Sequence, residues 1–351
     1  MEGDARCVSM VQSIRARKEF NHLSDEELLQ MQFCDLPVTL EGSPLKHRIS
    51  MLYEELEEHG LRFKPHIWLS EEWFTPDEVP GFAIPFYLAH PRLARLERKQ
   101  MLEVEGGTKR DFLRIMRHEA GHAIDNAYRL HSRRRYRELF GAFSRPYPDW
   151  YKPKPTSRDF VLNLPAWYAQ AHPAEDFAET FAVWLRGSGW KRHYAGWPAL
   201  KKVEYIDELM KEVSRRAPLN KSRERVDELS EIKTTLFDHY QRKREHYTFR
   251  WPPDYDRALK RIFVSEPNHN SAPAAAGFLS RHRRELCHEV AEGTGAHHYA
   301  IDQMLSHMIN RCRELKLKVD PAQDRTWQMV LVSLTIQTMN GILSGYHRIA
   351  L

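Results

Sequence analysis

His118-Glu119-Ala120-Gly121-His122 is the most informative stretch of this 351-residue sequence. On a helix, side chains four residues apart project from the same face, one turn apart. Both imidazoles can therefore reach one Zn²⁺, with Glu119 beside the open position of the metal as a general base. The alternative is a core helix whose two histidines only make hydrogen bonds. The neighbouring sequence has to decide between a metal site and such a helix.

The sequence around this motif predicts a long helix. Thr108 is a suitable N-cap, and Asp111 three residues later approximates a capping box. Apolar residues then recur at helical spacing, namely Phe112, Ile115, Met116, Ala120, Ala123 and Ala127. Gly121 weakens such a helix by about 1 kcal/mol relative to alanine. Its presence therefore predicts that another part of the chain approaches this face closely.

A second helix is predicted after His172, because Pro173 suits the first turn of a helix. Its apolar stripe consists of Phe177, Phe181, Trp184 and Leu185. Glu175 and Glu179 lie one turn apart beside that stripe, where two carboxylates repel each other unless a cation or donors lie between them. A zinc site needs this arrangement, with one glutamate on the metal and the other holding an imidazole in its tautomer. The alternative is a solvated acidic face.

The order of these residues resembles that of the gluzincin metallopeptidases, in which an H-E-x-x-H helix precedes a helix with a glutamate ligand. Residues 118–125, which read H-E-A-G-H-A-I-D, are similar to the motif helix of anthrax lethal factor and its relatives. Residues 175–181, which read E-D-F-A-E-T-F, are similar to the third-ligand helix of that family. Residues 172–181 are also similar to a bacterial family of zinc-binding metallopeptidases that carries H-P-x-E-D-aromatic-A-E. The resemblance covers residues 108–190.

The resemblance implies a role for each residue of the site. It implies that His118, His122 and Glu175 bind Zn²⁺ and that Glu119 is the general base. It also implies that Glu179 orients a histidine ligand and that Tyr168 faces the scissile carbonyl. His193 and Tyr194, which follow the second helix, are the alternatives to Tyr168 as the oxyanion donor. Many members of the bacterial family begin with a cysteine-rich zinc ribbon, and this sequence shows none.

The composition indicates a sizeable core under a charged surface, with 42% hydrophobic and 29% charged residues. The net charge of +5 does not by itself indicate nucleic acid, which is not an expected partner. Cys7, Cys34, Cys287 and Cys312 are scattered without a C-x-x-C pair, which indicates free thiols in a reducing compartment. Polar residues interrupt the apolar run 327–343, which favours a buried helix over a membrane span.

The N-terminal residues show no secretion signal, so we expect a cytoplasmic bacterial protein. We expect an α+β fold in three regions: a helical segment over residues 1–60, a zincin-like metallopeptidase domain over 61–217 and a helical accessory domain over 218–351. The zincin-like domain would hold a small sheet, the motif helix and the third-ligand helix.

Two short strands are predicted in the middle region, at Phe63–Leu69 and Gly81–His90. Pro85 indicates that the second is an edge strand. Such an edge suits an extended peptide substrate by β-addition, and an ordinary sheet edge is the equal alternative. Residues 131–166 read as a loop, in which Arg133-Arg134-Arg135 is interpreted as a solvated helix end.

Helices are predicted in the remaining regions. One helix begins near Ser24, and the others cover residues 45–59, 203–213, 226–247, 255–264, 274–292, 298–319 and 324–343. A loop is predicted over 268–273. His282, His288, His297 and His298 are interpreted as surface histidines.

These features predict a zinc-dependent peptidase that hydrolyses a peptide or protein in extended conformation and has no membrane partner. The alternatives are a non-peptidase zinc hydrolase, a DNA–protein crosslink protease, and a latent or inactive protease whose helical half binds a protein. The intact Glu119 argues against an inactive protease.

Overall fold

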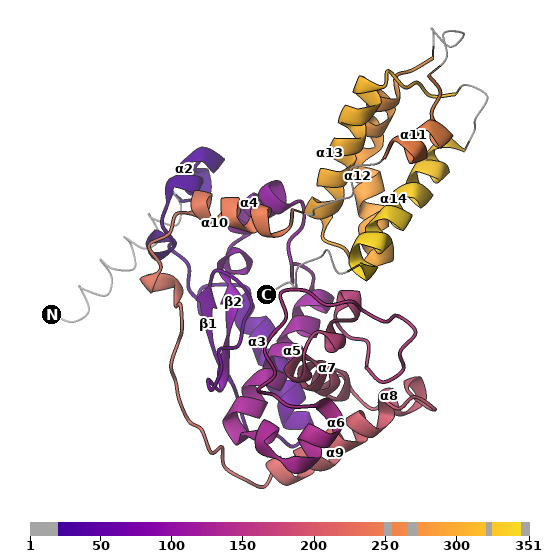
Figure 1. Cartoon of the computed structure of the whole chain (residues 1–351). Coiled ribbons are helices and arrows are strands. Elements are labelled where there is room, and N and C mark those ends of the chain that lie inside the picture. Colours follow the sequence, from indigo (N-terminus) through magenta and orange to yellow (C-terminus); the bar gives the residue numbers. More distant parts are fainter. Residues whose placement is uncertain (1–19, 249–254, 266–271, 321–324, 345–351) are drawn as a thin grey trace, which may run out of the picture.

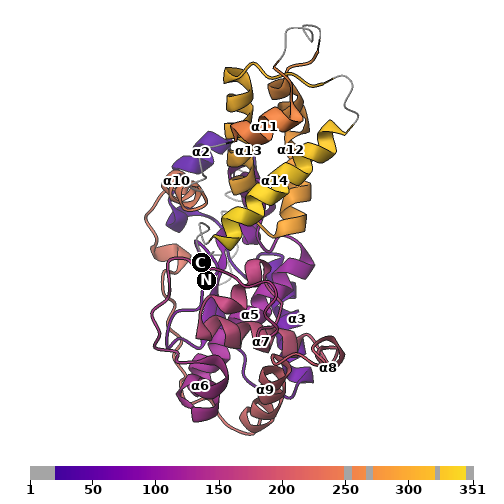
Figure 2. The same ribbon diagram turned by 45° about the vertical axis from the view of Figure 1, so that its right-hand side comes forward.

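The computed structural model of the protein describes residues 20–248, 255–265, 272–320 and 325–344. It is mostly helical and contains a sheet of two parallel strands, β1 (His66–Ser70) and β2 (Gly81–Pro85). Figure 1 shows the strands and most helices in one part and α11–α14 in a second part, and the turned view in Figure 2 agrees. This mixed architecture is compatible with the predicted α+β class.

The helices follow one another along the chain with the strands placed between α3 and α4. Their bounds are α2 (Asp25–Gln30), α3 (Leu45–Glu58), α4 (Pro91–Met101), α5 (Lys109–Tyr128), α6 (Arg134–Phe140), α7 (Pro173–Leu185), α8 (Trp190–His193), α9 (Leu200–Val213), α10 (Leu236–His246), α11 (Asp256–Ile262), α12 (Ala275–Thr294), α13 (His298–Glu314) and α14 (Thr326–Leu343).

The motif helix α5 begins as predicted. The hydroxyl of Thr108 accepts a hydrogen bond from the Asp111 N–H at 3.1 Å and donates one to the Asp111 carboxylate at 2.6 Å. These bonds satisfy one of the N–H groups that a helix leaves unpaired at its start. The predicted helices at Ser24 and Leu45 are also confirmed, and Ser24 forms a full capping box with Glu27.

Helices α5 and α7 pack directly against each other, and they come close together at Gly121. A Cβ at Gly121 would lie 2.8 Å from the Cα of Ala178, so no larger residue fits without moving backbone. The predicted close approach is therefore confirmed. All 13 residues of α7 are buried, which makes the alternative of a solvated acidic face wrong.

The strands are shorter than predicted, because the chain after Pro85 turns into a 3-10 helix over Phe86–Ala89. On its other side β2 is covered at Ala83, whose N–H donates to the Phe74 carbonyl at 2.8 Å. The predicted free edge is thus taken at this point by the segment around Phe74.

The helix predicted from Val226 is wrong over its first half, and α10 begins only at Leu236. Three side chains on one face of β1 contact backbone carbonyls in this stretch. The pairs are His66 with Glu224, Trp68 with Val226 and Ser70 with Asp227. These contacts hold residues 224–227 extended along β1, so the chain cannot begin a helix there.

Residues 131–166 are not all loop, because Arg134 begins the short helix α6. Arg133 and Arg135 form ion pairs with Glu212 and Glu208 of α9 at 2.7 and 2.6 Å. The arginine triplet therefore begins a helix and joins it to α9, where the sequence suggested a solvated helix end.

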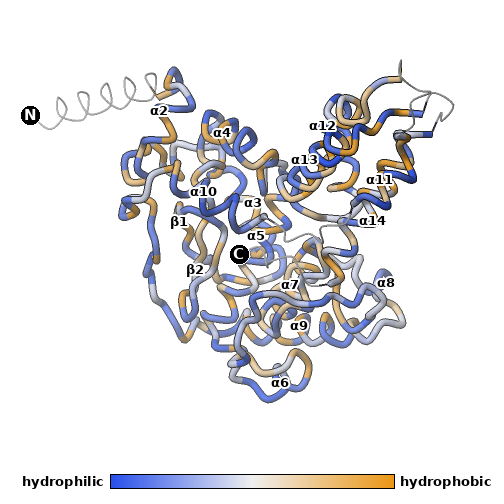
Figure 3. Tube along the Cα trace, turned by 45° about the horizontal axis from the view of Figure 1, so that its top comes forward, coloured by the Kyte–Doolittle hydropathy of each residue, from blue (hydrophilic) through white to orange (hydrophobic). Residues whose placement is uncertain are grey.

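The buried apolar residues form two main cores. The first extends from Phe20 to Tyr240, and the second from Tyr255 to Leu334. Figure 3 shows hydrophobic stretches in both parts. The domain limits at residues 60 and 217 remain predictions, and the change of core lies further along the chain, between Tyr240 and Tyr255.

The two parts meet at Glu103, which follows α4. His297 Nε2 lies 3.1 Å from one Glu103 carboxylate oxygen, and His298 contacts the other through its ring and its backbone N–H. The prediction of surface histidines is wrong for these two, because both are partly buried against Glu103. The sequence does not indicate this contact, since Glu103 lies far away along the chain. Nearby, a Cβ at Gly295 would lie 2.7 Å from Cβ of Pro165, so the turn between α12 and α13 touches the loop before α7.

Cys34, Cys287 and Cys312 are free thiols, as predicted, while Cys7 and most of the loop predicted over 268–273 lie outside the described residues. Within the described ranges, no helix combines the length and the apolar character that crossing a membrane requires.

Substitution of Gly121 tests the packing of α5 on α7. We expect Gly121→Ala to lower the free energy of unfolding by about 1–3 kcal/mol, because the added methyl group meets backbone. Gly277→Ala on α12 is the matched control, since nothing lies within 4 Å of a Cβ there; it should be neutral or stabilising by up to about 1 kcal/mol. Chemical denaturation measures both, and equal effects would contradict the packing argument.

The contact between Glu103 and His298 predicts a pH-dependent contribution to stability. The hydrogen bond to Glu103, opposed by burial, raises the pKa of His298 above 6.5. The stabilisation is therefore complete below pH 6.5 and is lost as the pH rises through the raised value. We expect His298→Gln to lower the free energy of unfolding more at about pH 6 than at about pH 9. His307→Gln, at an exposed position of α13, should show no such difference.

Candidate metal centre

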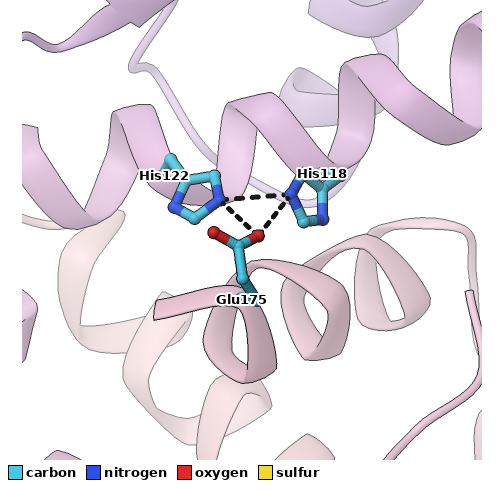
Figure 4. A group of neighbouring side chains, drawn as sticks. All are labelled: His118, His122 and Glu175. Atoms are coloured by element: carbon cyan, nitrogen blue, oxygen red, sulfur yellow. Dashed lines mark hydrogen bonds and ion pairs between the residues drawn. The ribbon is translucent and has the colours of Figure 1, made fainter. Parts of the chain in front are cut away.

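Three side chains converge where α5 crosses α7. His118 Nε2 lies 3.0 Å and His122 Nε2 lies 3.2 Å from the same oxygen of Glu175, Oε2, and the two imidazole nitrogens are 3.1 Å apart. Figure 4 shows both histidines pointing from α5 toward the carboxylate on α7. One ligand atom from each of the three side chains thus faces a common point, so the group could hold a metal ion.

The spacing of these atoms fits a tetrahedral metal. Ligand atoms at about 2.0–2.1 Å from Zn²⁺ lie about 3.3 Å from one another. The three observed separations of 3.0–3.2 Å are only slightly shorter. Two imidazoles and one carboxylate are also a donor set that zinc uses in hydrolytic enzymes.

Glu179 fixes the tautomer of His118. One of its carboxylate oxygens accepts from His118 Nδ1 at 2.8 Å and from the Asn163 side-chain amide at 2.8 Å, and the other accepts from the Leu164 N–H at 2.7 Å. With Nδ1 protonated, a neutral His118 turns the lone pair of Nε2 toward Glu175. Two facing lone pairs repel each other unless a proton or a metal cation lies between them.

The electrostatics of the cluster favour positive charge. Burial lowers the pKa of His118, but hydrogen bonds to Glu175 and Glu179 outweigh it and raise the pKa well above its ordinary value. Burial likewise raises the pKa of Glu175, yet His122 and His118 hold it well below the usual range. A site that attracts a proton this strongly also attracts a metal cation, which would displace that proton.

Glu119 is buried beside the three converging side chains, and its carboxylate accepts a hydrogen bond from a threonine hydroxyl. Thr75 Oγ1 donates to Glu119 Oε2 at 2.7 Å. Sequence reasoning missed Thr75, because no fixed spacing connects it to the motif; Thr75 follows the segment that pairs with β2.

The structure brings Tyr168, but neither of its alternatives, to the cluster. The Tyr168 ring centroid lies 5.6 Å from that of His118. The Tyr194 hydroxyl instead accepts from the Leu162 N–H at 2.9 Å, and His193 is exposed at the end of α8. Tyr168 belongs to a 3-10 helix in which Ala166 and Trp167 both have φ of 56°, a left-handed conformation that is strained for these residues.

Tyr147 is a second residue that the sequence did not indicate. Its hydroxyl donates to Oε1 of Glu175 at 2.8 Å, so the carboxylate oxygen turned away from the histidines also has a partner. The stretch around Tyr147 is predicted as loop, and nothing in its spacing points to α7.

A cavity of about 1340 Å³ opens on one side of the cluster. His118, Glu119, Trp150 and Tyr168 line it from the first part of the protein, and Tyr247 and His297 line it near the junction with the second part. The helical part therefore forms one wall of the space that leads to the candidate metal centre.

Comparison with known proteins gives one result. Residues 91–189, from the start of α4 to just beyond α7, match the family described as "Putative zinc-binding metallo-peptidase". The match supports the resemblance to a family of zinc-binding metallopeptidases, and the segment contains His118, Glu119, His122, Glu175 and Glu179. No curated protein and no solved structure matches the chain.

Metal analysis of purified protein tests the cluster. We expect about one zinc per chain, lost in His122→Ala and Glu175→Ala. Glu179→Ala should keep the metal with an affinity lower by about 10–100-fold, because it removes only the partner of a ligand. If Glu179→Ala lost the metal and Glu175→Ala kept it, the two glutamates would have exchanged roles.

Proposed function

We propose that the protein is a zinc-dependent peptidase of the gluzincin type, with a zincin-like catalytic part and a helical accessory part. The observation that carries the proposal is the convergence of His118, His122 and Glu175 at separations suited to zinc, next to Glu119. The family match over residues 91–189 supports peptide bonds as the substrate. Fold and ligands alone leave other hydrolytic substrates open.

Glu119 is the general base of this mechanism. Zinc held by His118, His122 and Glu175 would activate a water and stabilise negative charge on the substrate carbonyl oxygen. Glu119 removes a proton from the attacking water and delivers it to the leaving amine. The Thr75 hydroxyl holds Oε2 of Glu119, so the role of base falls to the other oxygen.

Tyr168 is the proposed donor to the carbonyl oxygen as it gains charge. Burial, with the nearby carboxylate of Glu175, raises the pKa of Tyr168 well above its ordinary value. The phenol therefore keeps its proton at neutral pH and can donate a hydrogen bond. Its ring already packs near His118, which places it on the side of the cluster that faces the cavity.

The proposed substrate is an extended peptide or protein segment. Phe74 forms an isolated antiparallel bridge with Ala83 of β2 and leads into Thr75, which touches the proposed base. An extended peptide that added to this segment would pass beside Glu119. The helical part, which lines the same cavity, would control access to it or recruit the substrate. The free thiols favour a cytoplasmic location.

Substitution of Glu119 separates chemistry from metal binding. Glu119→Gln keeps the shape and removes the base, so we expect zinc to stay and peptide turnover to fall by about 10²–10⁴-fold. Thr75→Val keeps the base and removes its hydrogen bond, so turnover should fall by about 10–100-fold. Chelator-sensitive hydrolysis of a mixed peptide library measures both.

Thr75→Ser is the matched control, because it retains the hydroxyl and should retain most of the turnover. Full turnover by Glu119→Gln would exclude this mechanism. Hydrolysis of esters without hydrolysis of any peptide would point to a different zinc hydrolase.

A further inference from the structure

We infer that Tyr147 is a positioning residue that makes Glu175 bind the metal through one oxygen only. The inference rests on the proposed zinc site and concerns a residue outside the motif. Its starting observation is that the two oxygens of one carboxylate have different partners: Oε2 faces both histidines, and Oε1 accepts from the Tyr147 hydroxyl at 2.8 Å.

The ring of Tyr147 is held in place by His172. The two rings stack with centroids 3.8 Å apart and an angle of 20° between their planes. About half of Tyr147 is exposed, at 51%, so its position depends on this stack and on its hydroxyl rather than on enclosure. The stack with His172 and the hydrogen bond to Glu175 together restrict the movement of this phenol.

His172 is itself fixed at both ring nitrogens. Its Nδ1 accepts from the Ala174 N–H at 3.2 Å, which caps the start of α7, and its Nε2 donates to the Arg145 carbonyl at 2.6 Å. This pattern requires the neutral imidazole, and burial lowers the pKa of His172 accordingly. His172 thus joins the loop that carries Tyr147 to the helix turn that carries Glu175.

The consequence lies in the geometry of the metal. A carboxylate can bind a cation through one oxygen or through both. If Glu175 used both, Oε1 would add a protein ligand and crowd the side of the metal where the attacking water binds. The hydrogen bond from Tyr147 engages Oε1 and leaves Oε2 between the imidazoles, so three protein atoms would hold the metal and a water could take a fourth position.

Tyr147→Phe in the full-length protein tests this role, because it keeps the stacked ring and deletes only the hydroxyl. We expect the dissociation constant for Zn²⁺, measured by competition with a chromophoric chelator, to rise by about 10–100-fold. With Co²⁺ in place of zinc, we expect the visible absorption to weaken as four-coordinate metal gives way to five-coordinate metal. Neither readout requires peptidase activity.

Two further variants make the result specific. Tyr128→Phe deletes a hydroxyl that donates to the Arg216 carbonyl at the far end of α5, and should bind both metals like wild type. Tyr168→Phe should also bind both metals like wild type, since the role proposed for Tyr168 is toward the substrate. Thermal unfolding checks that each variant is folded.

An affinity of Tyr147→Phe for Zn²⁺ within about twofold of wild type, with an unchanged Co²⁺ spectrum, would overturn the inference. If wild type binds zinc and cleaves peptides in that case, only the role of Tyr147 fails. If wild type binds no zinc, the proposed function fails, and the inference fails with it.

Discussion

The close approach of α5 and α7 at Gly121 is the constraint on which the candidate site depends. Because the two backbones approach closely at Ala178, the residues three positions before and one position after the contact on each helix face those of the other helix. His118 and His122 flank Gly121 on α5, and Glu175 and Glu179 flank Ala178 on α7. A side chain at residue 121 would push the helices apart, and the separations of 3.0–3.2 Å between donor atoms would not survive.

Buried negative charge is the second organising feature, because each carboxylate of the site requires partners inside the protein. Glu179 has three donors, from His118, Asn163 and the Leu164 backbone. Glu175 lies between two imidazoles and a phenol, and Asp176 next to it is paired with Lys202 at 2.6 Å. Burial still raises the pKa of Asp176 to about 7 despite Lys202, whereas the partners of Glu179 and Glu175 offset much of the cost of burying them. A divalent cation between Glu175 and the histidines would add to that compensation.

The parts of the site that the sequence predicted are those joined by helical spacing. His118 and His122, like Glu175 and Glu179, are four residues apart, and a period of 3.6 residues places each pair on one face. Thr75 and Tyr147 were missed because they reach the site from irregular segments, where no period relates sequence distance to position. The helix predicted from Val226 failed for a related reason: side chains of β1, more than 150 residues earlier, hold its carbonyls.

The helical part of the protein meets the site through the loop before α7. Gly295 touches Pro165, and the next two residues of that loop, Ala166 and Trp167, hold a left-handed conformation that costs of order 1–3 kcal/mol each. Strain of this kind persists only where the surroundings enforce it. On either side of the strained pair lie Leu164, whose N–H binds Glu179, and Tyr168, which packs near His118. The α12–α13 turn therefore packs against the same short loop that supports Glu179 and carries Tyr168. This contact connects the position of the helical part to the geometry of the site.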